Sequence, residues 1–125
     1  MEHISREATG DEPAVDFNPE TGQLQLTGES YPEYPGIFYT PLIKWAEQFI
    51  TTKPEKIELF IHLRYFNTSS SKCLIDLLEI LEEYAETGGH VTVFWHYDQG
   101  DVDALEAGKD LDEDIQLHFV FEEVK

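Results

Sequence analysis

The spacing of apolar residues changes repeatedly along this 125-residue chain, and these changes constrain its fold more than any other feature. Residues 56–66, 90–97 and 115–121 alternate apolar and polar side chains, as β-strands with two unlike faces do. Between the first two of these segments, residues 74–85 carry an apolar stripe at helical spacing, opposite a row of acidic residues. The pattern therefore predicts strands that are connected by helices.

The N-terminal half of the chain adds a hairpin and another helix to this pattern. Residues 15–26 contain two short alternating segments around a turn sequence, which predicts two paired strands. Residues 37–49 have helical spacing but include Pro41, and proline is tolerated only in the first turn of a helix. We therefore expect the regular part of this helix to begin near Thr40.

The acidic segment 101–112 predicts a short third helix, which Gly108 interrupts or ends. The expected order is thus β-β-α-β-α-β-α-β. Because strand-helix-strand units cross over with a right hand, their helices should lie on the same side of the sheet. We predict a single α/β domain at 13–125, with a mixed sheet of about five strands and helices mainly on one face. Residues 1–12 are polar and are expected to form a loose leader.

The chain is strongly acidic, with 8 Lys and Arg against 26 Asp and Glu and a formal net charge of −18. This charge would repel a phosphate backbone or an anionic bilayer, so we expect neither nucleic acid nor membrane as a partner. No apolar run approaches the roughly 18 residues that a membrane span requires. The single cysteine, Cys73, is expected in the core and fits a reducing cytosol, which predicts a cytoplasmic protein.

The most unusual local sequence is the hydroxyl cluster, which consists of Asn67, Thr68, Ser69, Ser70, Ser71 and Lys72. It lies where a predicted strand passes into a predicted helix. Helix capping requires only one such residue, so capping does not explain four hydroxyls. Phosphorylation is a sharper interpretation, since the unpaired N–H groups, the positive end of the helix dipole and Lys72 favour a phosphate. The added negative charge could repel a partner that docks on the bare site, which would make the cluster a switch.

Two other interpretations of the hydroxyl cluster stay open. Ser69 and Lys72 formally match a Ser-x-x-Lys nucleophile pair of a small hydrolase, although the companion motifs of penicillin-binding enzymes are absent. Alternatively, the chain is a constitutive protein-binding scaffold whose hydroxyls only cap the helix. We identify no catalytic residue, no cofactor-binding residue and no metal ligand. The five histidines lack metal-site spacing, and Asp98, Asp101 and Asp103 lack the register of a calcium loop.

The predicted strands also carry apolar residues on the face opposite their main apolar stripes. These residues are Phe60, Phe66, Phe94 and Val120. If helices cover only one face of the sheet, these side chains are partly exposed. They then lie either beneath loops and the N-terminal segment or in a protein-binding patch, and the sequence leaves both possibilities open.

Several segments of the chain, between about Ala14 and Glu122, resemble the SiaC family of bacterial regulatory phosphoproteins. The most specific is Tyr-Phe-Asn-Thr-Ser-Ser-Ser-Lys at residues 65–72. The supporting segments, in the same order as in the family, are residues 15–22, 28–33, 38–42 with Trp45, and 101–108.

The resemblance implies a fold similar to the STAS-type anti-sigma-factor antagonists and a protein that is not an enzyme. It further implies that a serine/threonine kinase phosphorylates Thr68 and that a PP2C-type phosphatase removes the phosphate. The unphosphorylated form would bind and activate a diguanylate cyclase, which raises cyclic di-GMP and promotes biofilm formation or aggregation. Among the hydroxyls of the cluster, the resemblance alone selects Thr68.

Overall fold

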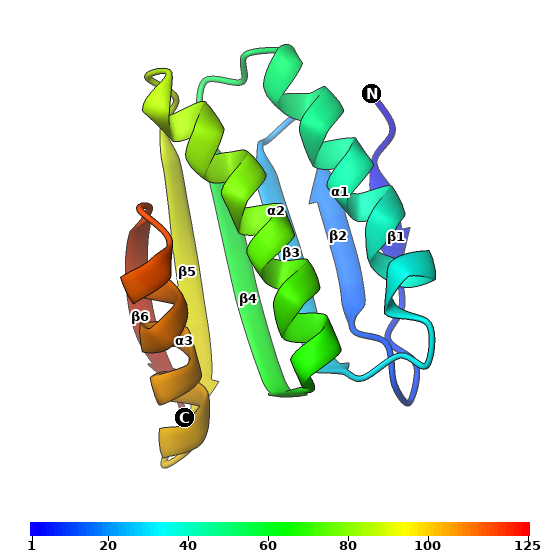
Figure 1. The fold of residues 1–125 in the computed structure, drawn as a ribbon, viewed down its shortest axis with the longest axis vertical. Coiled ribbons are helices and arrows are strands. Elements are labelled where there is room, and N and C mark those ends of the chain that lie inside the picture. The colour runs from blue at the N-terminus through cyan, green and yellow to red at the C-terminus, as the bar shows by residue number, and fades with distance from the viewer.

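The structure is a computed structural model that describes residues 1–125, and it contains one six-stranded sheet and three helices (Figure 1). The strands are β1 (Ile4–Arg6), β2 (Ala14–Asn18), β3 (Gln23–Ser30), β4 (Ile57–Phe66), β5 (Val91–Asp98) and β6 (His118–Val124). The helices are α1 (Pro35–Thr51), α2 (Thr68–Glu86) and α3 (Val102–Asp114). The strands lie side by side in sequence order.

The sheet is mixed, because its first three strands are antiparallel and β3 to β6 are parallel. One helix joins each pair of neighbouring parallel strands, and all three helices cover the same face, as Figure 1 shows. This arrangement confirms the predicted mixed α/β sheet with helices on one face. The sheet has six strands, however, and not about five.

The additional strand is β1, which lies within residues 1–12, the segment expected to be a loose leader. It pairs antiparallel with β2, where Ile4 lies opposite Phe17, and the Ile4 side chain is buried. The indole N–H of Trp45 on α1 donates a hydrogen bond to the carbonyl oxygen of Glu2 at 2.7 Å. A single apolar residue has no periodicity, so only these long-range contacts identify the strand.

The helix α1 begins at Pro35 and not near Thr40, as its proline had suggested. Pro35 suits the first turn, because the N–H that it lacks would have no partner there. Pro41 lies inside the helix, where it cannot donate to the carbonyl of Ile37. Residues 37 and 41 are both exposed, so water can reach the free carbonyl, while buried Tyr39 anchors the same turn to the core.

The last strand also begins later than predicted, at His118 and not at residue 115. Helix α3 continues to Asp114, and residues 115–117 connect it to β6. Its end is marked by Ile115, whose backbone N–H donates to the Leu111 carbonyl at 2.9 Å. Ile115 is buried at the C-cap of α3. Its apolar side chain therefore belongs to the end of the helix and not to the start of the strand.

A bulge in β4 reverses the expected direction of its last side chains. The register between β3 and β4 shifts after Leu63, which leaves Arg64 as the extra residue on β4. In the alternation of residues 56–66, Tyr65 falls on the main apolar face, which predicts a buried side chain, but it is 52% exposed. Phe66 was predicted on the opposite face, but it packs against the core, with its ring centroid 6.0 Å from that of Trp95.

The hydrophobic core lies between the helices and the sheet. Cys73 on α2 is partly buried against this core, as expected, and its burial raises the pKa of the thiol. On the helix-free face, the rings of Phe60 and Phe94 stack with centroids 4.7 Å apart, and Val120 pairs with Phe94. These three side chains are partly exposed. None of the three helices combines the length and apolar character needed to cross a membrane.

Candidate phosphorylation site at the start of α2

The hydroxyl cluster lies at the edge of the sheet where β4 ends and α2 begins. Asn67, the residue between them, is the N-cap of α2, and its side-chain oxygen accepts a hydrogen bond from the Ser70 N–H at 2.9 Å. The Asn67 N–H donates to the carbonyl of Ser30, at the end of β3, at 3.1 Å. Because Asn67 alone supplies the side-chain cap, the four hydroxyls that follow it are free for other roles.

These four hydroxyls have different environments, although they are consecutive in the sequence. Thr68 and Ser69 are exposed, Ser71 is half-buried, and Ser70 is fully buried. The first turn of α2 contains no acidic side chain, and the exposed Lys72 takes part in none of the ion pairs of the protein. The first turn of α2 therefore adds no negative charge of its own beside Thr68 and Ser69, and a helix N-terminus of this kind favours an anion.

Ser70 belongs to a buried hydroxyl triad with Ser30 and Tyr39. The Ser30 hydroxyl donates to the Ser70 oxygen at 2.7 Å, and its own oxygen lies 2.5 Å from the Tyr39 hydroxyl, which must then be the donor. Burial raises the pKa of Tyr39, although the hydrogen bonds with the two serines oppose this shift. The triad joins the end of β3 to the second turn of α1 and the first turn of α2, and sequence patterns did not reveal it.

Arg64, on the strand that precedes the hydroxyl cluster, is paired with a residue outside the cluster. Arg64 donates to the carboxylate of Asp98 at 3.1 Å, and His62 lies 2.8 Å from the same carboxylate. The hydrogen bond from His62, followed by that from Arg64, holds the pKa of Asp98 below its usual value. Asp101 caps α3 by accepting from the Ala104 N–H, and nowhere do three or more His, Cys, Asp or Glu side chains form a possible metal site.

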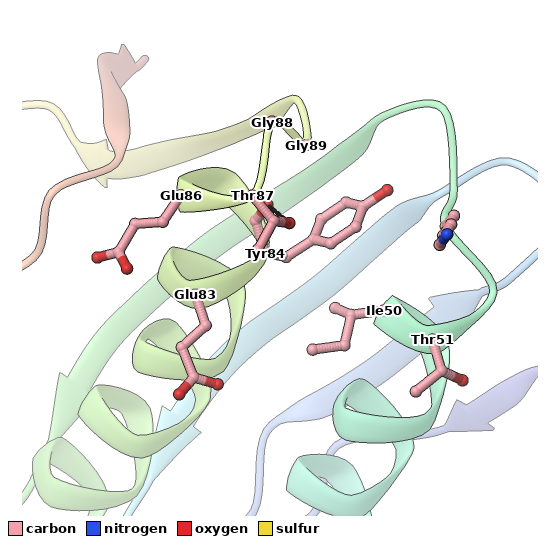
Figure 2. Close-up of a pocket in the computed structure, with 9 residues that line it drawn as sticks. Ile50, Thr51, Glu83, Tyr84, Glu86, Thr87, Gly88 and Gly89 are labelled. Atoms are coloured by element: carbon pink, nitrogen blue, oxygen red, sulfur yellow. Dashed lines mark hydrogen bonds between the residues drawn. The ribbon is translucent and has the colours of Figure 1, made fainter.

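Ser69 and Lys72, the hypothetical hydrolase pair, are both exposed on the surface of α2. A nucleophile normally works in a concave pocket, but the largest surface cavity lies at the other ends of α1 and α2 (Figure 2). It has a volume of about 820 Å³ and includes none of the hydroxyl cluster. Tyr84 lines this cavity and donates to the carbonyl of Pro54 at 2.6 Å.

Comparison with known proteins identifies the family. Residues 6–124, which include the whole hydroxyl cluster, match the family described as SiaC family regulatory phosphoprotein. The chain belongs to the SiaC family. This confirms the resemblance that was visible in residues 65–72.

Solved structures resemble this SiaC-family protein over its whole length. Apo-SiaC from Pseudomonas aeruginosa is 33% identical, with a TM-score of 0.92 over 98% of this chain and 99% of that one. A crystal structure of the diguanylate cyclase SiaD in complex with its activator SiaC, from the same organism, matches with 32% identity and a TM-score of 0.92. That match covers 99% of this chain and 100% of the other.

Among curated sequences, an uncharacterized protein of Pseudomonas aeruginosa (strain UCBPP-PA14) is 32% identical over 122 residues. The similarity covers 98% of this chain and 97% of that protein. The similarity to these relatives therefore extends over the complete sheet and all three helices.

Proposed function

We propose that this SiaC-family protein is a partner-switching regulatory phosphoprotein, and that Thr68 is its phosphoacceptor. The observation that carries the proposal is an exposed threonine in the first turn of α2, next to a cap that Asn67 already supplies. Unpaired backbone N–H groups and Lys72 favour a phosphate at this position. Ser69 is also exposed, and the choice of Thr68 rests on the family resemblance, whereas modification of buried Ser70 would first require the triad to open.

In this proposal, the unphosphorylated protein binds and activates a diguanylate cyclase in the cytoplasm, and it has no enzymatic activity of its own. The support is the crystal structure of the relative SiaC in complex with the diguanylate cyclase SiaD, of which that SiaC is the activator. Cyclic di-GMP would then rise and promote biofilm formation or aggregation. As the family resemblance implies, a serine/threonine kinase adds the phosphate and a PP2C-type phosphatase removes it.

The phosphoacceptor can be tested with the cognate kinase and ATP. We expect a mass increase of about 80 Da, the mass of one phosphoryl group, located at Thr68 by fragmentation. Ser69→Ala is the matched control and should be modified as the wild type is. Addition that persists in Thr68→Ala would refute the assignment.

The switch itself is tested by titrating the cyclase with bare and with phosphorylated protein. We expect phosphorylation to weaken binding by about tenfold or more and to remove the stimulation of cyclic di-GMP synthesis. Equal affinity in the two states would instead identify a constitutive scaffold, whose hydroxyl cluster is only part of the helix start.

A further inference from the structure

Four of the six large apolar side chains that are exposed in this protein lie at one end of the molecule. We name them the aromatic end surface, which consists of Tyr31 (41% exposed), Tyr34 (64%), Ile37 (75%) and Tyr65 (52%). They come from the loop after β3, the first turn of α1 and the end of β4. Figure 1 shows that these elements meet at the edge of the sheet where α1 and α2 begin.

Hydrogen bonds hold this surface next to Thr68. Ser30, which precedes Tyr31, is bonded to Tyr39 in α1 and to Ser70 in α2, so the three elements are tied together at this edge. The rings of Tyr31 and Tyr65 meet edge to face with centroids 5.8 Å apart. Tyr65 is separated from Thr68 by only two residues. A phosphate on Thr68 would therefore stand at the border of the aromatic end surface.

We propose that the aromatic end surface is where the unphosphorylated protein docks on its diguanylate cyclase, through an uncharged apolar segment of that enzyme. This inference rests on the proposed function and adds the contact residues. Tyrosine is enriched among residues that dominate binding energies, because it buries a large area and loses few rotamers. Ile37 is a large aliphatic side chain left in water at the start of a helix, and burial by a partner would remove its exposed area from solvent.

The charge of the molecule distinguishes among possible occupants of the surface. A second copy of a chain with a net charge of −18 would be repelled, and so would an anionic bilayer. The net charge of this chain therefore favours a different protein as the partner that covers the aromatic end surface. If that protein covers Thr68 with an apolar segment, a phosphate there would lose its hydration without gaining a counter-charge, so phosphorylation would prevent docking.

The inference is tested by calorimetric titration of the cyclase with the unphosphorylated full-length protein. The double variant Tyr34→Ser/Ile37→Ser should bind at least about tenfold more weakly, and Tyr65→Ser should weaken binding independently. The matched control is Val102→Ser, because Val102 is 60% exposed at the start of α3, beyond β5 (Figure 1). The control should bind like the wild type, and circular dichroism should show that all variants remain folded.

Three outcomes would overturn the inference, and they have different consequences. If phosphorylation weakens binding of the wild type, but the double variant and Tyr65→Ser bind normally, the docking surface lies elsewhere and the proposed function stands. If the unphosphorylated wild type does not bind the cyclase, both the docking surface and the proposed function are wrong. An equal loss of binding in Val102→Ser would also refute the assignment to the aromatic end surface.

Discussion

Ser69 and Ser70 are neighbours with the same side chain, and the fold gives them opposite environments. Ser69 faces solvent, whereas Ser70 is buried and accepts a hydrogen bond from Ser30. A kinase can reach the first hydroxyl without any change in the protein, but it can reach the second only after the start of α2 separates from β3 and α1. At the scale of residues, the hydroxyl cluster therefore divides into an exposed part that can be modified and a buried part that positions the helix.

Replacement of Ser70 by alanine should destabilise the protein. The Ser30 hydroxyl would lose its acceptor inside the core, and a buried donor without a partner costs about 1–3 kcal/mol. Urea unfolding measures this free energy. The control Ser69→Ala should stay within about 0.5 kcal/mol of the wild type, since its side chain is exposed. Equal stabilities of the two variants would contradict the role of the triad.

The lowered pKa of Asp98 predicts how the stability of the protein depends on pH. The hydrogen bond from His62 is the largest cause of its lowered pKa, and Arg64 adds to the effect. The stability that this carboxylate provides is therefore present above its unfolded pKa of about 3.9 and is lost as the pH falls through the lower folded value. In a carboxyl NMR titration, His62→Ala should raise the pKa of Asp98 more than Arg64→Ala does. An unchanged pKa in His62→Ala would rule out this cause.

At the scale of elements, the position of α3 depends on one close contact with β5. The Trp95 indole N–H donates to the Ala104 carbonyl of α3 at 2.9 Å, one turn before Gly108. We had expected Gly108 to interrupt or end this helix, yet the helix continues through it to Asp114. The glycine is present because the indole occupies the space where a side chain would stand, since an added Cβ would lie 2.5 Å from Trp95 Nε1.

Gly108→Ala should therefore destabilise the protein, although alanine favours helices. Overpacking typically costs about 1–3 kcal/mol, and over most of this range the cost exceeds the gain of about 1 kcal/mol in helix propensity. An added Cβ only 2.5 Å from the Trp95 ring places Gly108 in that part of the range. The matched control is Gly36→Ala in the first turn of α1, where an added Cβ meets nothing within 4 Å. We expect this control to be neutral or stabilising in urea unfolding. A stable Gly108→Ala variant would show that α3 can shift away from the sheet.

At the scale of the whole molecule, the net charge of −18 acts against the compact state through self-repulsion. Added salt screens this repulsion, because the Debye length falls from about 30 Å at 0.01 M to about 8 Å at 0.15 M ionic strength. We therefore expect the midpoint of thermal unfolding to rise by a few degrees over this range of NaCl. A midpoint that falls with salt would mean that attractive ion pairs dominate over the net charge.

The local sequence determined much of this protein by itself. Apolar periodicity predicted five of the strands, the three helices and the single helical face, because amphipathic patterns and crossover handedness are properties of short segments. The change of period also located the hydroxyl cluster correctly, at the passage from β4 into the first turns of α2. The choice of Thr68 within the cluster came from the family resemblance and not from physical reasoning.

Only the tertiary structure decided the features that depend on residues far apart in the chain. Ile4 belongs to a strand because β2 and Trp45 lie beside it, and one extra residue at Arg64 turned Tyr65 outward beside Thr68. Ser30 and Ser70 form their hydrogen bond across 40 positions of sequence. Periodicity reports which face of an element is apolar, but it carries no information about bulges or about which polar side chains meet when elements pack.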